Sequence, residues 1–199
     1  MDNHNMKIIG LTGSIGMGKT TTAAMFKKHG VPTIDADQIV HQLYENEAVA
    51  LIEEAFPGTT DGKTVDRKKL STFVIGQPDS FKKLEAIIHP LVRQKQDEFI
   101  KSHREQGADM VLLDIPLLFE TGAQSRVDIV VVVTCDPEIQ KKRVLARENM
   151  NIDKFNAILK KQLPDAEKRK LADHIVDTSV SFEETEAQVI ALLSNLRQN

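Results

Sequence analysis

The hydrophobic residues of this chain gather in short continuous runs instead of alternating with polar residues. The strongest runs occupy 7–12, 109–114 and 127–134, and weaker ones occupy 31–34 and 173–177. Continuous apolar runs are typical of strands in a parallel sheet, because helices cover both faces of such a sheet. Helical segments separate the runs, so the pattern predicts an open α/β sheet with crossover helices.

Two long segments do not fit this sheet. Residues 37–106 are predicted to be mostly helical, with interruptions at the turn-rich stretches FPGTTDGK and IGQPDS. Residues 137–170 are predicted to be helical and are strongly basic. We therefore expect a core built from residues 1–36, 107–136 and 171–199, which carries one large helical insert and one smaller basic insert.

The first apolar run is followed by a phosphate-binding motif. Residues 13–20, GSIGMGKT, match G-x-x-x-x-G-K-[ST] between a predicted strand and a predicted helix over 20–29. Glycines allow backbone N–H groups to turn toward anionic oxygens, Lys19 can reach the β- and γ-phosphates, and the Thr20 hydroxyl can bind Mg²⁺. The helix N-terminus also attracts anions. The alternative is a glycine-rich turn that binds nothing, but the flanking strand and helix favour a polyphosphate site.

The apolar run 109–114 ends in a carboxylate, Asp114, within MVLLDIPLLFE. This arrangement resembles the second motif of nucleotide sites, whose carboxylate holds Mg²⁺ directly or through water. The next residue is Ile115 and not an acid that could activate water, which argues against an ATP-driven motor. The chain also lacks an Asn-Lys-x-Asp stretch, which argues against a guanine-specific switch.

Asp35 and Asp37 follow the second apolar run, in PTIDADQIVH. On an extended segment, side chains two residues apart point to the same side. One of these carboxylates could accept the proton of a hydroxyl that attacks the γ-phosphate. Either could instead cap the helix that is expected to begin near Ala36. The spacing alone leaves both roles open.

The basic insert contains Arg143 and Arg147 in the stretch QKKRVLAR. At a spacing of i, i+4 the two side chains share one face of a helix. Two arginines on a mobile lid could stabilise the charge of a phosphoryl group in transfer and exclude water. The alternative is a solvated helix face, and the phosphate-loop motif favours the lid.

The stretch HPLVR, residues 89–93, is predicted to begin a helix, with Pro90 in its first turn. Arg93 could then contact an anionic substrate or pair with a nearby glutamate. The other histidines show no metal-binding spacing, and Cys135, the one cysteine, is expected to be a small buried residue. The sequence therefore predicts neither a disulfide nor a cysteine-based metal site.

Composition narrows the class of protein. The 199 residues carry a net charge of −3, which suits an α/β domain with inserts and offers no broad basic surface for nucleic acid. No apolar run approaches the roughly 20 residues of a membrane span, and the first ten residues lack the pattern of a signal peptide. We expect a cytoplasmic protein and, because no large exposed apolar helix face is evident, a monomer. Either Met1 or Met6 could be the first residue translated.

Taken together, these stretches resemble the dephospho-coenzyme A kinase family. The resemblance runs from Ile8 to about Thr185 and rests, in the family's order, on IGLTGSIGMGKTT, IDADQIVH, VDRKKL, IIHPLVR, VLLDIPLLFE, QKKRVLARE and KKQLPDAEKRKLADHIVDTS. It implies ATP-dependent phosphorylation of the ribose 3′-hydroxyl of dephospho-coenzyme A, giving coenzyme A and ADP. It also implies a P-loop kinase core like that of nucleoside monophosphate kinases, an open parallel sheet with helices on both faces, in which 37–106 forms the substrate domain and 137–170 the lid.

The resemblance assigns roles to individual residues. Asp35 would be the catalytic base, assisted by Lys19 and Arg143, and Thr20 and Asp114 would hold Mg²⁺. Contacts to ATP would come from Gly13, Ser14, Ile15, Gly16, Met17, Gly18, Lys19, Thr20, Thr21, Arg147 and Thr178. Contacts to the acceptor would come from Asp37, His89, Arg93, Leu117, Leu118, Phe119 and Glu120.

The chain departs from the family pattern at two places. Ile158 stands where an arginine is usual, four residues before the Gln of the Q-M-P stretch, and Lys160 or Lys161 would supply a charge there without the fork of a guanidinium. Thr178, in VDTSV, stands where the family usually has Asn near the adenine. Both departures lie away from the residues assigned to phosphoryl transfer.

Two other functions compete with this one. The first is a different small-molecule kinase of the same architecture, acting on a nucleoside monophosphate or a shikimate-like acceptor. The second is a P-loop protein that holds a nucleotide as a signal. The paired carboxylates and the two arginines argue against the second, because a passive binder needs neither.

Overall fold

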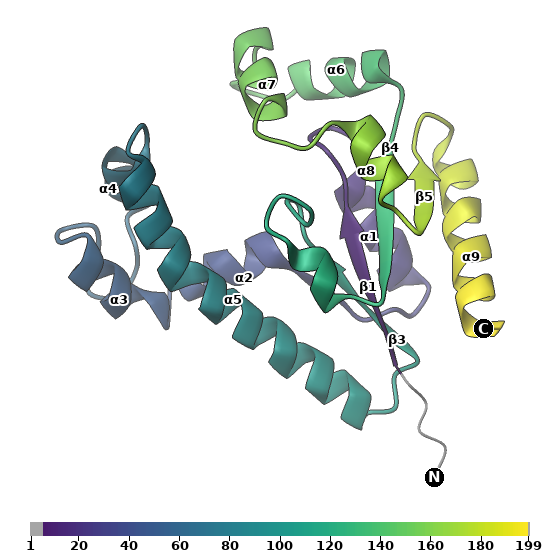
Figure 1. Cartoon of the computed structure of the whole chain (residues 1–199), viewed down its shortest axis with the longest axis horizontal. Coiled ribbons are helices and arrows are strands. Elements are labelled where there is room, and N and C mark those ends of the chain that lie inside the picture. The colour runs from purple at the N-terminus through teal and green to yellow at the C-terminus, as the bar shows by residue number, and fades with distance from the viewer. Residues whose placement is uncertain (1–5, 199) are drawn as a thin grey trace. The chain divides into compact units, whose positions relative to one another are not determined.

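The computed structural model describes residues 6–198, which fall into two compact units (Figure 1). One unit comprises Met1–Thr33 and His103–Asn199, and the other comprises Ile34–Ser102. Residues 1–5, which belong to the stretch considered above for a signal peptide and for the first translated residue, lie outside the described residues.

Five strands form one sheet in the order β2-β3-β1-β4-β5. Strand β1 pairs in parallel with both β3 and β4, and β4 pairs in parallel with β5. The strands are β1 (Lys7–Thr12), β2 (Thr33–Asp35), β3 (Met110–Asp114), β4 (Ile129–Thr134) and β5 (His174–Asp177). The apolar runs therefore become strands within one or two residues of their predicted ends, and the predicted open α/β sheet is confirmed.

One face of the sheet packs on α1 and α9. Alternate residues of β1, such as Ile9 and Leu11, are fully buried in a cluster with Phe26 of α1 and Leu193 of α9. On the other face, Gly10 lies so close to the segment after β3 that a Cβ there would be 2.7 Å from the Leu118 Cδ1 atom. The helices of this unit are α1 (Lys19–Lys28), α6 (Pro137–Leu145), α7 (Ile152–Leu159), α8 (Asp165–Lys170) and α9 (Phe182–Gln198), with a 3₁₀ turn at Ala123–Arg126.

The second unit is helical and has its own core. Its helices are α2 (Ala36–Leu43), α3 (Ala48–Ala55), α4 (Arg67–Val74) and most of α5 (Pro78–Glu105). The core is formed by Ile39, Leu43, Ala48, Val49, Ile52, Phe56, Val65, Leu70 and Ile88. The stretch FPGTTDGK interrupts the helices between α3 and α4, as predicted. Only the first three residues of IGQPDS separate α4 from α5, because α5 begins at Pro78.

The prediction that a helix begins at His89 is wrong. Pro90 lies inside α5, twelve residues after its first residue, Pro78. A proline in a helix interior forfeits one backbone hydrogen bond and crowds the preceding turn. The helix continues because residues before and after Pro90, among them Ile88 and Leu91, pack into the core of the second unit.

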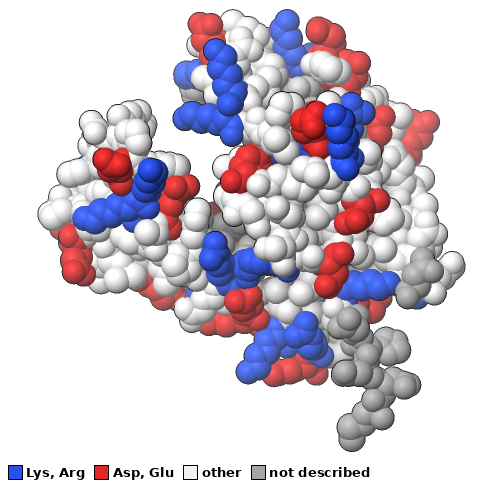
Figure 2. Space-filling model, in the orientation of Figure 1, with Lys and Arg blue, Asp and Glu red and all other residues white. Residues whose placement is uncertain are grey.

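Positive and negative side chains are mixed on the face shown in Figure 2. Lys and Arg alternate there with Asp and Glu, and no single sign dominates that face. This agrees with the net charge of −3. Within residues 6–198, no helix is both long and apolar enough to cross a membrane.

Candidate active site

The phosphate-loop motif forms the connection between β1 and α1, at the carboxyl edge of the sheet. Gly16 and Gly18 have positive φ angles of 80° and 89°, a conformation that residues with a Cβ rarely adopt. Gly18 is the N-cap of α1, and none of the described side chains caps this helix end. The first N–H groups of α1 are therefore available to an anion, in the direction that the helix dipole favours.

Lys19 and Asp114 meet at this edge of the sheet. Asp114 ends β3 beside Leu11 of β1, and its carboxylate Oδ1 forms an ion pair with the Lys19 Nζ atom. The Asp114 side chain is only 2% exposed and that of Lys19 is 15% exposed. A buried carboxylate is costly without a partner, and Lys19 compensates the charge of Asp114.

The residues at hand suit a magnesium ion shared with a nucleotide. Asp114 and the exposed Thr20 offer one carboxylate and one hydroxyl at the end of the loop. Nowhere in residues 6–198 do three or more His, Cys, Asp or Glu side chains come together as a metal site. Mg²⁺ in kinases takes one or two protein ligands and completes its octahedron with phosphates and water, so this donor set fits Mg²⁺ together with a polyphosphate.

A cavity of about 310 Å³ lies beside the loop within the same unit. It brings together two loop glycines, Arg143 and Arg147, and part of the chain after β5. Its lining is Gly16, Gly18, Thr21, Thr22, Met25, Arg143, Arg147, Thr178, Val180, Phe182 and Thr185. Of the residues predicted to contact ATP, five line this cavity: Gly16, Gly18, Thr21, Arg147 and Thr178.

Hydrogen bonds link Arg143 and Thr178 to the phosphate loop. The two guanidinium nitrogens of Arg143 donate to the Thr178 side-chain and backbone oxygens, each at 2.8 Å. The Thr178 hydroxyl donates in turn to the carbonyl of Met17 at 2.8 Å. Thr178 is buried and its hydroxyl hydrogen is already engaged with the loop. The expectation that Thr178 lies away from the residues assigned to phosphoryl transfer is wrong, because it is bonded to Arg143 and to the phosphate loop.

The prediction that Arg143 and Arg147 share a helix face is wrong, because α6 ends at Leu145. Arg147 lies in the turn that follows, where its N–H donates to the Val144 carbonyl. The polar stretch after Leu145 includes Asn149, whose positive φ of 59° cannot continue a helix. Both arginines nevertheless line the same cavity.

Asp35 caps a helix in the second unit. It ends β2, and its Oδ1 accepts hydrogen bonds from the N–H groups of Asp37 at 2.7 Å and Gln38 at 3.4 Å. The capping role considered for Asp35 is confirmed, and Asp37 lies in the first turn of α2. The extended geometry expected for the pair is wrong, because α2 begins at Ala36, between them. The second oxygen of Asp35, Oδ2, takes no part in the two capping bonds.

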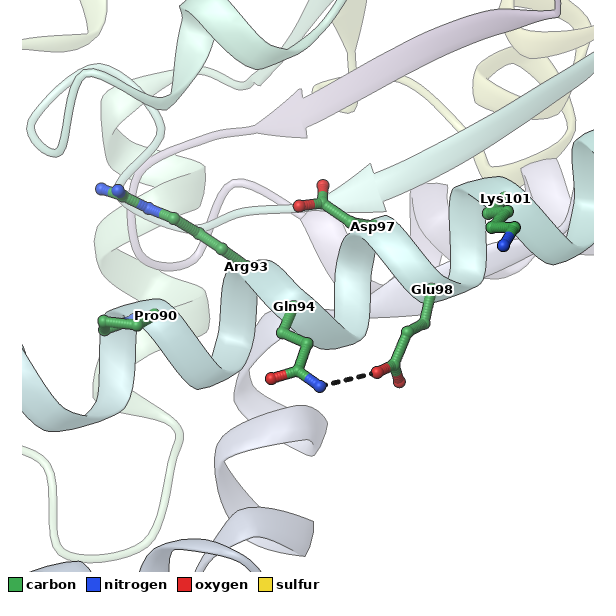
Figure 3. A pocket seen from close by; sticks show the side chains of 6 residues that line it. All are labelled: Pro90, Arg93, Gln94, Asp97, Glu98 and Lys101. Atoms are coloured by element: carbon green, nitrogen blue, oxygen red, sulfur yellow. Dashed lines mark hydrogen bonds between the residues drawn. The ribbon is translucent and has the colours of Figure 1, made fainter.

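His89 and Arg93 lie on α5, in the same unit. The His89 Nε2 atom is 3.9 Å from the Glu85 Oε1 atom, one turn earlier. Arg93 lines an open hollow of about 520 Å³ along α5 with Pro90, Gln94, Asp97, Glu98 and Lys101. In Figure 3, Arg93 and Asp97 extend from one side of the helix, while Gln94 and Glu98 extend from the other and are joined by a 2.8 Å hydrogen bond.

The segment Leu117 to Glu120 divides into different environments. Leu118 is fully buried against β1, whereas Leu117 is 41% exposed and Phe119 is partly buried. The Glu120 carboxylate Oε1 accepts from the Leu163 N–H at 2.7 Å and lies 2.9 Å from the Lys168 Nζ atom. Leu117 and Phe119 therefore keep exposed surface, while Glu120 is hydrogen-bonded to the chain between α7 and α8.

Comparison with known proteins identifies the group to which this site belongs. The family model described as "CoaE: Dephospho-CoA kinase" matches residues 7–184. The dephospho-CoA kinase of Rhizobium meliloti (strain 1021) is 56% identical over 192 residues, which cover 96% of this chain and 99% of the relative.

The chain belongs to the dephospho-CoA kinase family. Solved structures agree. The structure of TT1252 from Thermus thermophilus has a TM-score of 0.82 at 34% identity, and covers 96% of this chain and 98% of its own. The dephospho-CoA kinase from Campylobacter jejuni has a TM-score of 0.67 at 25% identity, with 96% and 97% coverage. The family resemblance inferred from the sequence and the P-loop kinase fold are both confirmed.

Sequence reasoning missed three residues of this dephospho-CoA kinase family chain that contact or support the loop. Gln162 accepts a hydrogen bond from the Ile15 N–H, and Gln140 donates one to the Ile15 carbonyl. Lys168 is a fully buried cation that pairs with Glu120. A further cavity of about 490 Å³ places Lys160 beside Ser14 of the loop. Both glutamines lie in stretches quoted for the family resemblance, but a neutral glutamine carries no charge or periodicity signal that would have assigned it a contact with the loop.

Proposed function

We propose that this chain transfers the γ-phosphoryl group of ATP to the ribose 3′-hydroxyl of dephospho-CoA. The observation that carries the proposal is the loop of residues 13–20 at the uncapped N-terminus of α1, with Lys19 against the buried Asp114, in a chain that matches the family model over residues 7–184. This combination supplies what phosphoryl transfer needs, namely positioning and neutralisation of charge.

ATP would lie across the loop and the neighbouring cavity. The N–H groups at the start of α1 would hold phosphate oxygens, and Arg147 at the cavity wall would add a positive charge. Val180 and Phe182 give the cavity apolar surface on which a flat purine ring could rest. Arg143, already bound to Thr178, would act here mainly by fixing the shape of the site.

Thr20 and Asp114 would hold Mg²⁺ together with oxygens of the bound phosphates. When bound, Mg²⁺ would neutralise charge on the β- and γ-oxygens as the phosphoryl group leaves. Lys19 would then exchange its contact with Asp114 for a contact with the phosphates. The Lys19 ammonium would then move from one anion to another, and it would stay paired with a negative charge throughout the reaction.

Asp35 would accept the proton of the 3′-hydroxyl. Its Oδ1 is committed to the N-terminus of α2, which would leave Oδ2 to accept the proton. The hydroxyl oxygen would attack the γ-phosphorus as its proton passes to Asp35, and ADP would leave with the bond electrons. Asp37, His89, Arg93, Leu117 and Phe119 would hold the acceptor, with Ile34–Ser102 as the acceptor-binding unit and 137–170 as the lid.

The proposal includes a cytoplasmic monomer whose partners are small molecules, with neither nucleic acid nor membrane among them. The net charge of −3 and the mixed charges on the face in Figure 2 support the exclusion of nucleic acid.

The test is ADP release with ATP and Mg²⁺, measured with and without dephospho-CoA, followed by mass spectrometry of the acceptor. We expect acceptor-dependent ADP and a product heavier by one phosphate on the 3′-oxygen. The Lys19→Ala variant is the matched negative control, because it should lose this activity. Turnover with a nucleoside monophosphate or shikimate, and none with dephospho-CoA, would contradict the proposal. So would ATP hydrolysis that no acceptor stimulates.

A further inference from the structure

Two glutamines bind the backbone of Ile15, in the middle of the phosphate loop, one at its N–H group and one at its carbonyl. The Ile15 N–H donates to the Gln162 Oε1 atom at 3.1 Å, and the Ile15 carbonyl accepts from the Gln140 Nε2 atom at 2.7 Å. Gln140 projects from α6 and is 6% exposed. Gln162 belongs to the short connection between α7 and α8. These contacts come from the part of the chain predicted to be the lid.

The connection that carries Gln162 is hydrogen-bonded to Glu120, in the segment after β3. The next N–H, that of Leu163, donates to the Glu120 Oε1 atom at 2.7 Å. The same oxygen lies 2.9 Å from the Nζ atom of Lys168, whose side chain is 0% exposed. This ion pair joins α8 to the segment after β3, so that Glu120 fixes the backbone one residue after Gln162.

We propose that Gln162 is a positioning residue for the phosphate loop, and that Glu120 and Lys168 act through it. The loop needs such support because its glycines have no side chains with which to anchor it, and its conformation includes two positive φ angles. An N–H group donates one good hydrogen bond at a time. The Ile15 N–H is therefore committed to Gln162, and the phosphates are held by the N–H groups after Ile15.

This inference deepens the proposed function and rests on it, because the loop is taken to position ATP. It changes the role of Glu120, which was expected to contact the acceptor. The carboxylate instead holds the Gln162 connection against the sheet, while Leu117 and Phe119 remain as acceptor contacts.

The experiment compares four variants of the full chain: Gln162→Met, Lys168→Met, the double variant Gln162→Met/Lys168→Met, and Lys170→Met as control. Methionine has nearly the shape of glutamine but accepts no comparable hydrogen bond, and it keeps much of the length of lysine. Lys170 lies on the same helix as Lys168, but its pair with Glu167 is exposed, at 69% and 50% for the two side chains. Each variant is assayed for kcat, for the KM of ATP, and for hydrogen exchange of the peptide that covers residues 13–18.

Loss of one neutral hydrogen bond corresponds to about a three- to tenfold effect. We expect Gln162→Met to lower kcat by this factor, with the KM of ATP changed less than about twofold, because a misplaced γ-phosphate slows the chemical step more than binding. Lys168→Met should lower kcat in the same direction. The double variant should be no slower than the slower single variant, since both changes act through one contact. Lys170→Met should match the wild type.

Hydrogen exchange gives a readout that does not depend on turnover. Exchange in residues 13–18 should be faster in Gln162→Met and Lys168→Met than in the wild type or Lys170→Met. Unchanged exchange and unchanged kcat in Gln162→Met would overturn the inference, and so would losses that multiply in the double variant. If the wild type itself shows no acceptor-dependent ADP release, the proposed function fails, and the exchange result alone then decides whether Gln162 holds the loop.

Discussion

Replacing Glu120 with glutamine should destabilise the protein strongly, because it leaves the buried Lys168 ammonium without its negative partner. The Lys168 side chain is 0% exposed, and among the described residues the Glu120 carboxylate is its ion-pair partner. The contact has poor hydrogen-bond geometry, so the ammonium depends on the negative charge and not on a well-directed bond. Removing one partner of a buried ion pair costs about 3–5 kcal/mol. For a chain of this length, that is a fall in the melting temperature of roughly 6–20 °C.

Thermal unfolding followed by circular dichroism measures this effect. The double variant Glu120→Gln/Lys168→Met should recover much of the lost stability, because neither side chain is then charged. Lys170→Met serves as the control and should change the free energy of unfolding by less than about 0.5 kcal/mol, since exposed ion pairs contribute little. A Glu120→Gln variant as stable as the wild type would refute the reasoning. A double variant less stable than Glu120→Gln alone would refute it equally.

Three further predictions concern the loop, the base and the pH dependence. The Asp35→Asn variant should keep the cap of α2 and therefore its melting temperature. Its kcat should fall by about 10²–10⁴, since an amide cannot accept the proton. An unchanged kcat would remove Asp35 from the mechanism. The Gly18→Ala variant should have a lower melting temperature than Gly30→Ala. Both glycines have positive φ, but of the two only Gly18 would bring its new Cβ close to another side chain, 3.0 Å from the Thr178 hydroxyl oxygen. Equal losses of melting temperature in the two variants would contradict this. Hydrogen bonds, first from Lys28, lower the pKa of Glu186. Its contribution to stability is therefore present above the unfolded pKa of about 4.3 and lost as pH falls through the lower folded pKa, so the difference in urea midpoint between Glu186→Gln and the wild type should shrink on acidification.

The parts of the fold that the sequence predicted are those that depend on local pattern. The apolar runs became strands because strands buried on both faces need continuous hydrophobic residues. The loop of residues 13–20 was predictable because its glycines and Lys19 occupy fixed positions between a strand and a helix. The capping role of Asp35 was also foreseeable, since capping is local chemistry.

The parts that the sequence could not predict depend on packing between distant segments. The helix α5 continues through Pro90 because its apolar side chains fill a core, and this gain is invisible to a rule about proline. The contact between Ile15 and Gln162 spans 147 positions and involves a backbone group, which no residue pattern encodes. Arg147 left the helix face assigned to it because α6 ends two residues earlier. Arg147 nevertheless lines the cavity beside the loop, and its contact with ATP stays a prediction.

The pairing of Lys19 with Asp114 has a consequence for the order in which ligands arrive. The Asp114 carboxylate is paired with the Lys19 ammonium, so a free divalent ion would have to compete with that ammonium. The competition changes when a polyphosphate enters the loop, because Lys19 then has a second anion to bind. In the proposed site, Asp114 would become accessible to metal only as Lys19 is drawn away. If Asp114 holds Mg²⁺ as proposed, the site would accept the metal and the nucleotide together and would discriminate against the metal alone.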